Sequence, residues 1–146
     1  MISFGIWRLV LRNQQGFTFV ELSIVVVIIG VLATLAIPTY VNMQDRAKES
    51  QVSGNAHTLQ LAVEDFAVCN DGEYSVAQAD ILPLLPGSSR FANAFTGAMT
   101  EPQFGTPAVS FGQVGLLGIQ EGARTTGYII NGWGKDGEIL VYSRGQ

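Results

Sequence analysis

A long apolar stretch near the N-terminus dominates the hydrophobic pattern. Residues 17–40 read FTFVELSIVVVIIGVLATLAIPTY, and between Leu22 and Ile37 the only polar side chains are those of Ser23 and Thr34. As a helix with a rise of about 1.5 Å per residue, this stretch spans about 36 Å, enough to cross a bilayer core of about 30 Å. The roughly 100 residues that follow are too few to cover such a helix on every side. Residues 17–40 are therefore predicted to form a membrane-spanning helix.

Beyond Tyr40 the helical pattern continues in amphipathic form. Spacings of four, three, four and three residues define one apolar seam, formed by Val52, Ala56, Leu59, Val63 and Phe66. The opposite face carries polar side chains, those of Asp45, Lys48, Glu49, Gln51, Gln60 and Glu64. Asn70-Asp71-Gly72 has the composition of a helix-ending turn. The pattern predicts one helix from Phe17 to about Cys69, whose second half is the spine of a globular head.

Shorter segments follow the predicted helix. Ser75 is expected to cap a short helix through Leu82 that ends at Pro83 and Pro86. Residues 87–112 are rich in Gly, Ser, Thr and Pro and are expected to form an irregular loop. Three apolar runs separated by turn residues then predict an antiparallel meander, Val114–Ile119, Gly127–Ile130 and Glu138–Tyr142. Packed on the seam, this small sheet would bury Leu59, Val63 and Phe66. The expected fold class is α+β.

Composition and charge narrow the possible functions. Charged residues make up 14% of the chain and hydrophobic residues 47%, with 8 basic and 12 acidic side chains. Because Arg8 and Arg12 both precede residue 17, residues 17–146 carry 6 basic and 12 acidic groups, a net charge of −6. Such an acidic chain lacks the basic surface that nucleic-acid binding requires. The single cysteine, Cys69, cannot form a disulfide within the chain, and no Cys/His cluster has zinc-site spacing.

A polar break, Arg12-Asn13-Gln14-Gln15-Gly16, immediately precedes the apolar stretch. A secretory signal is cleaved after its apolar segment, at small residues in an A-x-A-like pattern. The nearest match here, Ala33-Thr34-Leu35-Ala36, has the wrong spacing. The Gly16–Phe17 junction is instead a flexible and accessible point. A protease on the cytoplasmic side that cut there would leave the whole apolar helix on the product.

Glu21 is the one charged residue inside the apolar stretch. A carboxylate at mid-bilayer costs a few kcal/mol, less near the interface, and commonly marks function. One interpretation is an interfacial side chain that reaches the lipid headgroups. In the other, a cut after Gly16 creates an ammonium on Phe17, and Glu21 of one chain pairs with that ammonium on a neighbouring chain. Such a pair would neutralise two charges in a low-dielectric environment and fix the axial stagger between subunits.

The segment Gly16-Phe17-Thr18-Phe19-Val20-Glu21, followed by the long apolar run, resembles the class III prepilin cleavage and methylation motif. Type IV pilins and the pseudopilins of type II secretion share this motif. The resemblance implies cleavage after Gly16, N-methylation of Phe17 by prepilin peptidase, and assembly into a helical filament with Glu21 as the assembly glutamate. It also implies a pilin-like division into a leader (residues 1–16), a transmembrane or filament-core helix (17–40) and a head with its amphipathic helix (41–146).

Gly30 and Pro38 interrupt the predicted membrane helix. Pro38 lacks the N–H that would bond to the Thr34 carbonyl, and Gly30 weakens a helix by about 1 kcal/mol relative to alanine. An ordinary kinked membrane helix would contain such residues. Related pilins have a helix-weakening Gly and Pro at these places, which favours a segment that uncoils when subunits enter a filament.

Other candidate sites give weaker signals. Gly132-Trp133-Gly134-Lys135-Asp136-Gly137 matches GxGxxG, but the next residues read as a strand, so a hairpin turn is expected instead of a dinucleotide site. No cofactor is predicted, with calcium the one alternative, because the resemblance implies a calcium loop in this region and Asp136 and Glu138 are nearby carboxylates. His57 is expected to be solvated, and Cys69 to be a packed or idle thiol. No nucleophile and base can be assembled, so no enzyme is predicted.

The sequence therefore favours a structural subunit of a type IV pilus-like filament. A type II secretion pseudopilin is the alternative within the family, and a signal-anchored ligand-binding membrane protein is the alternative from another class. The resemblance implies four partners besides the chain itself: prepilin peptidase, an assembly ATPase, an inner-membrane platform and an outer-membrane secretin. It also implies a single pass through the bacterial inner membrane, N-terminus in and C-terminus out, before export into a periplasmic or extracellular filament.

Overall fold

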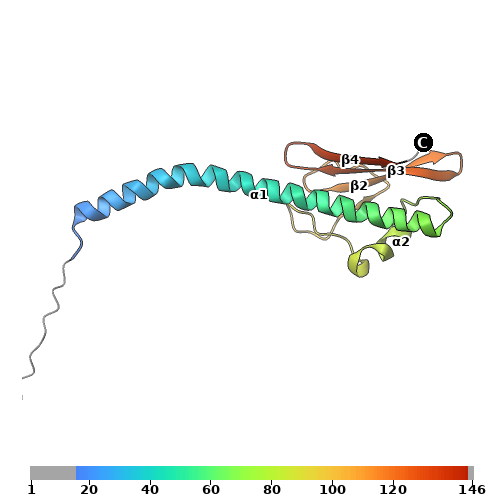
Figure 1. Ribbon diagram of the computed structural model, residues 1–146, viewed down its shortest axis with the longest axis horizontal. Helices are drawn as coiled ribbons and strands as arrows, with labels where there is room; N and C mark the ends of the chain where they lie inside the picture. Colours follow the sequence, from blue (N-terminus) through green and yellow to red (C-terminus); the bar gives the residue numbers. More distant parts are fainter. Residues whose placement is uncertain (1–15, 145–146) are drawn as a thin grey trace, which may run out of the picture. The chain divides into compact units, whose positions relative to one another are not determined.

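The computed structural model describes residues 16–144, and most of the predicted leader, including Arg8 and Arg12, lies outside them. The chain divides after Thr39 into two compact units. The first contains the apolar N-terminal part of helix α1, and the second, called the head below, contains residues 40–144 (Figure 1). Helix α1 runs from Phe19 to Cys69, which confirms the predicted helix to within two residues at its start.

The N-terminal part of α1 is apolar and exposed along its length. It is long and apolar enough to cross a membrane, and none of its most apolar stretch is buried. Gly30 and Pro38 both lie within the helix. The hydroxyl of Thr34 donates to the Gly30 carbonyl at 2.9 Å, and that of Thr39 to the Leu35 carbonyl at 3.1 Å. Both hydroxyls are thus hydrogen-bonded within the helix, where a bilayer offers them no water.

The turn after Cys69 ends α1 as predicted. The amides of Asn70 and Gly72 both donate to the Ala67 carbonyl, at 3.2 and 2.9 Å. Asp71 and Gly72 adopt positive φ values of 54° and 81°, the left-handed conformation that closes helix C-termini. Chain reversal at this turn brings the following segment back along the head, where the Tyr74 amide donates to the Thr125 carbonyl at 3.0 Å.

Short helices follow the turn: α2 (Gln78–Ile81) and two 3₁₀ helices, η1 (Leu82–Leu84) and η2 (Pro86–Ser88). The prediction that Ser75 caps a helix through Leu82 is wrong in two respects. The α-helix begins only at Gln78 and no side chain caps it; the Ser75 hydroxyl accepts from the Ala77 amide and donates to Asp80 Oδ2. Pro83 and Pro86 do not end a helix but lie in the two 3₁₀ turns.

A four-stranded mixed sheet completes the head, in the order β1-β2-β3-β4. The predicted antiparallel meander is confirmed by β2 (Val114–Glu121), β3 (Arg124–Trp133) and β4 (Glu138–Arg144). The strands extend beyond the predicted runs because the hairpins between them are tight. The predicted irregular loop contains β1 (Gln103–Phe104), which pairs in parallel with β2 and makes the sheet mixed.

The core of the head lies between the apolar seam of α1 and the inner face of the sheet. Seam residues Val52, Ala56, Leu59 and Val63 are fully buried, whereas Phe66 is only partly buried. They pack in one cluster with Val114, Leu116, Tyr128 and Ile130 of the sheet and with Ile81 and Leu85. Close approach of sheet to helix requires small residues, since a Cβ at Gly132 would lie 3.0 Å from the Val52 side chain.

The polar face predicted for the second half of α1 needs correction. Asp45, Glu49 and Glu64 bind residues of β3, β4 and the turn between them, so they do not lie on the face opposite the seam. These three positions flank the seam, so the sheet that covers the seam also reaches them. The sequence separations of 64 to 90 residues explain why a local pattern could not reveal these contacts.

Two leucines of α1 provide a matched test of this packing. Leu59 is fully buried, and Leu61, two residues on, is 58% exposed. Leu59→Ala should lower the free energy of unfolding of the head by about 2–5 kcal/mol, because it removes buried methyl groups and leaves a cavity. Leu61→Ala should change it by no more than about 0.5 kcal/mol. Denaturant titration of the full chain in detergent measures both, and equal effects would contradict the packing.

Candidate functional site

The Gly16–Phe17 junction precedes the first turn of α1. Residues 16–18 are not helical, and the Phe17 side chain is 87% exposed. A Cβ placed on Gly16 would meet nothing within 4 Å. A protease needs an accessible, extended peptide, and a helical one would first have to unfold. Among the described residues, positions 16–18 are therefore accessible and non-helical.

Thr18 and Glu21 form a reciprocal cap at the start of α1. The Thr18 amide and hydroxyl donate to Glu21 Oε2, at 2.9 and 2.8 Å, and the Glu21 amide donates to Thr18 Oγ1 at 3.2 Å. This is the capping box, in which the side chains of the first and fourth residues satisfy each other's backbone amides. It also places the Glu21 carboxylate at the positive end of the helix dipole.

Thr18 is a site residue that the sequence reasoning missed. The signal was present, since Thr-x-x-Glu before an apolar run is the pattern of a capping box. Both bonds from Thr18 go to the same carboxylate oxygen. An ionised carboxylate has about four acceptor positions over its two oxygens, so the cap leaves room for a further donor.

A second polar cluster joins α1 to the last two strands. Glu64 accepts hydrogen bonds from the Tyr128 hydroxyl at 2.7 Å and from Arg144 Nη1 at 3.0 Å. Burial and the bond to Glu64 raise the pKa of Tyr128 to about 12. Burial raises the pKa of Tyr74 as well, and its ring packs edge-on against Tyr128. Hydrogen bonds of this cluster, and no disulfide, connect the C-terminal strand β4 to helix α1.

A third contact lies at the β3–β4 turn. Lys135 Nζ lies 2.6 Å from Asp45 Oδ2, and the Lys135 amide donates to Glu49 at 3.3 Å. The hydrogen bond and charge of Asp45 raise the pKa of Lys135. The turn joins two antiparallel strands, so the GxGxxG match is a hairpin, as predicted.

The weak metal candidates do not converge. Glu138 accepts a hydrogen bond from Asn131 Nδ2 at 2.9 Å, while Asp136 is exposed on the turn. Over residues 16–144, no group of three or more His, Cys, Asp or Glu side chains is placed to hold a metal ion. His57 is exposed, with Nδ1 3.4 Å from the Gln60 amide oxygen, and Cys69 is exposed with a free thiol.

Glu101, which the sequence reasoning passed over, organises the segment before β2. Its carboxylate is fully buried and accepts hydrogen bonds from Asn93 Nδ2 at 3.2 Å, the Thr100 hydroxyl at 3.0 Å and the Val114 amide at 3.1 Å. These three donors, with Gln103 Nε2 at 3.5 Å as a fourth, offset the cost of burying this charge without a cation. The role of Glu101 is structural, because it joins residues 93–101 to the first residue of β2.

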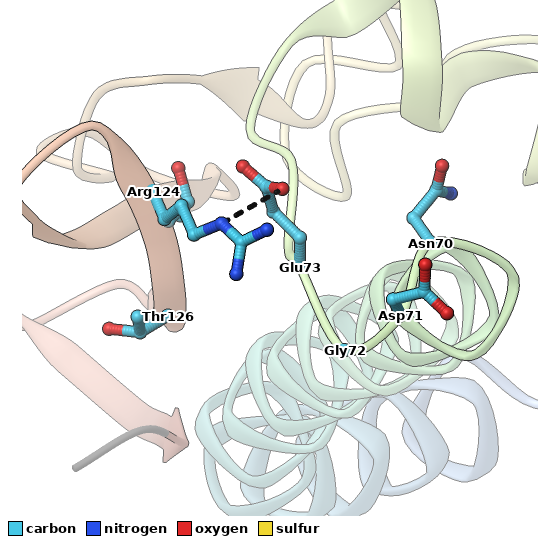
Figure 2. Close-up of a pocket in the computed structure, with 7 residues that line it drawn as sticks. Asn70, Asp71, Gly72, Glu73, Arg124 and Thr126 are labelled. Carbon is cyan, nitrogen blue, oxygen red and sulfur yellow. Dashed lines mark ion pairs between the residues drawn. The ribbon is translucent and has the colours of Figure 1, made fainter.

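An open pocket lies where α1 ends, between residues 70–73 and 124–126 (Figure 2). The Arg124 side chain points toward Glu73, with Nε 3.9 Å from Oε2, while Asp71 projects from the helix end. Arg124 is largely exposed, so this ion pair contributes little to stability. The lining combines a guanidinium, carboxylates and hydroxyls, without a base positioned to activate a nucleophile.

Comparison with known proteins also identifies similarity in the N-terminal segment. Residues 11–37 match the family model described as the prokaryotic N-terminal methylation motif. The chain is 46% identical over 54 residues to the type IV major pilin protein PilA of Myxococcus xanthus, which covers 37% of this chain and 24% of that protein. No solved structure matches it.

Two further relatives extend the comparison. A probable minor fimbrial protein of Dichelobacter nodosus is 38% identical over 95 residues, 64% of this chain and 56% of that protein. The type II secretion system core protein G of Pseudomonas aeruginosa is 36% identical over 59 residues, 40% of this chain and 42% of that protein. The matched regions thus span from about a quarter to just over half of these relatives.

The raised pKa of Tyr128 predicts how the stability of the head depends on alkaline pH. Below about pH 10 the tyrosine is protonated in both the folded and the unfolded chain. Between about pH 10 and 12 the unfolded chain loses the proton first, so the free energy of unfolding falls. From pH 9 to 11.5 this loss should be about 2 kcal/mol. The Tyr128→Phe variant should lose correspondingly less stability, with only groups such as Tyr74 and Lys135, whose pKa values are also raised, still contributing. Parallel pH profiles for both proteins would contradict the buried bond to Glu64.

Proposed function

We propose that the chain, whose N-terminal segment is similar to those of type IV pilins and pseudopilins, is a structural subunit that polymerises into a pilus-like filament through α1. One observation carries this proposal: an exposed apolar helix begins with a capped carboxylate, directly after an accessible Gly-Phe junction. Such a helix needs apolar surroundings both before and after assembly of the filament. The bilayer supplies them before assembly, and the helices of neighbouring subunits supply them afterwards.

Processing would remove residues 1–16 and methylate the new terminus. The non-helical backbone of residues 16–18 supports a cut between Gly16 and Phe17. The product would then consist of the filament-core helix over residues 17–40 and the head over residues 41–146. Cleavage also changes the electrostatics, because it places an ammonium on Phe17, one residue before the Thr18–Glu21 cap.

Glu21 would set the register between subunits. In the single chain its carboxylate accepts two hydrogen bonds from Thr18 of the same chain. In a bundle of apolar helices, the remaining acceptor positions would bind the Phe17 ammonium of a neighbour. An ion pair in a low-dielectric environment tolerates little displacement, since either charge left alone there costs several kcal/mol. The pair therefore selects one axial stagger.

The subunit would rest in the bacterial inner membrane, with its N-terminus in the cytoplasm and its head in the periplasm, until it is assembled. Its partners would be further copies of the chain, prepilin peptidase, an assembly ATPase, an inner-membrane platform and an outer-membrane secretin. No catalytic role is proposed. The similarity to a type II secretion core protein G favours a second candidate function, a pseudopilin whose filament stays in the periplasm.

The N-terminus of the native protein tests processing. Intact-mass analysis of the chain purified from a bacterium with prepilin peptidase should give residues 17–146 with one added methyl group. A Gly16→Val variant should keep its leader, whereas Gly5→Val, the matched change within the leader, should be processed normally. A product that starts at Met1 or near residue 37 would contradict the proposal and support a signal-anchored membrane protein.

We also propose that the segment from Gly30 to Pro38 uncoils during assembly. Gly30→Ala would stabilise the helix by about 1 kcal/mol, which should slow filament formation roughly fivefold. Gly54→Ala is the matched control, because Gly54 also lies in α1 and neither glycine has an atom within 4 Å of an added Cβ. Filament yield over time measures both variants. Equal rates, or a filament reconstruction with unbroken helical hydrogen bonds over residues 30–38, would overturn this proposal.

A further inference from the structure

The first turns of α1 in the head are helical but do not belong to its core. Between Tyr40 and Gln51 no side chain is buried, and apolar ones such as those of Tyr40 and Met43 are both 63% exposed. The first core residue of the helix is Val52. A helix frays where its packing stops, since most helical stability in proteins comes from an apolar face packed on other elements. Contacts outside the core therefore hold residues 40–51 in the helix.

Three side chains of this segment are partly buried, and two of them bind one residue of the β3–β4 turn. They are those of Asp45, Lys48 and Glu49. Lys135 Nζ lies 2.6 Å from Asp45 Oδ2, and the Lys135 amide donates to Glu49 Oε1 at 3.3 Å. Lys48 Nζ lies 5.3 Å from the centre of the Phe95 ring. We call Asp45, Glu49 and Lys135 the turn clamp.

The turn clamp combines an ion pair with a fixed backbone contact. The Asp45 side chain is only 20% exposed, so this pair is less accessible to water than most surface pairs. The hydrogen bond and charge of Asp45 raise the pKa of Lys135, which keeps its ammonium charged. Gly134 brings the turn backbone close to Glu49, because a Cβ there would lie 2.8 Å from Glu49 Oε1. Two successive turns of α1 are thus attached to the sheet.

Uncoiling that begins near Pro38 would reach this segment next along the chain. Pro38 cannot donate to the Thr34 carbonyl, and Tyr40 follows two residues later in the same helix. Helices form and uncoil residue by residue once a break exists. If uncoiling ended only at the core, residues 40–51 would lengthen from about 18 Å as a helix to about 40 Å when extended. The residue at which uncoiling ends therefore sets the length of the connection between the filament-core helix and the head.

We propose that the turn clamp ends this uncoiling: it holds α1 helical from Asp45 onward, so that only the segment before it lengthens when the subunit enters the filament. This inference rests on the proposed function and on the proposed uncoiling from Gly30 to Pro38. The turn clamp lies entirely within the head, so it acts in the same way before and after assembly. It gives every subunit a connection of the same length, which a regular polymer of identical subunits requires.

Hydrogen exchange of the full chain in detergent micelles tests this role before any filament forms. Lys135→Met removes the charge and keeps an apolar stem, and because Lys135 lies outside α1 the intrinsic helix propensity is unchanged. Backbone amides of residues 45–51 should exchange about three- to fivefold faster in this variant, since loss of the ion pair makes local opening easier. Amides of the packed turn around Leu59 should exchange at the wild-type rate.

Arg46→Met is the matched control. Arg46 is an exposed cation that lines the same cleft as Lys135, and it forms no ion pair among residues 16–144. Its replacement should leave exchange unchanged. Salt gives a second control, since raising it from about 0.01 M to about 1 M should accelerate exchange at residues 45–51 in the wild type far more than in Lys135→Met. Unchanged exchange in Lys135→Met, equal acceleration in Arg46→Met, or acceleration throughout the head would each overturn the role of the turn clamp.

Filaments separate this role from the proposals on which it rests. In reconstructions of wild-type filaments, helical hydrogen bonding should resume by Asp45. In Lys135→Met filaments the break should extend toward Val52, and breaks that end at the same residue in both would overturn the inference. If neither protein polymerises, the proposed function fails, and exchange in micelles still decides whether the turn clamp holds the helix.

Discussion

One carboxylate at the start of an apolar helix constrains the surroundings in which that helix can be buried. Glu21 lies in the first turn of α1, and its cap with Thr18 satisfies both the charge and the first backbone amides of the helix. In a single chain near an aqueous interface, the capped carboxylate needs no further partner. It becomes insufficient inside a bundle of helices, where a carboxylate needs a cation close by. Proteolysis at Gly16 is the step that would create this cation.

The two parts of helix α1 differ in which of their faces are buried. In the head, most of a narrow seam centred on Leu59 is buried in the core, against the sheet and the segment with Ile81 and Leu85. Flanking carboxylates such as Asp45 and Glu64 are hydrogen-bonded to residues of β3, β4 and their turn. In the N-terminal part, apolar side chains are exposed all round the helix. A helix that is apolar on every side can exchange lipid for other helices without a change in its own surface.

Sequence patterns predicted the features whose causes are local. The apolar run and the seam predicted α1, Asn70-Asp71-Gly72 predicted its end, and alternation with turn residues predicted β2, β3 and β4. The two-residue strand β1 and the buried Glu101 were not predicted, because both depend on contacts with β2 across the fold. The start of α1 at Phe19 was within reach of the sequence, since Thr18 and Glu21 have capping-box spacing. Roles of Gly16, Phe17 and Glu21 in assembly remain predictions.

The central claim is that Glu21, capped by Thr18 of its own chain, also forms an ion pair with the N-terminal ammonium of a neighbour. Solid-state NMR on filaments grown from an equal mixture of two labelled copies tests it directly. One copy carries ¹⁵N at the Phe17 terminus and the other carries ¹³C at the Glu21 carboxylate. The account predicts a dipolar coupling between the two copies at ion-pair separation, about 4 Å or less. Well-formed filaments in which the Glu21 carboxylate couples only to Thr18 of its own chain would contradict it.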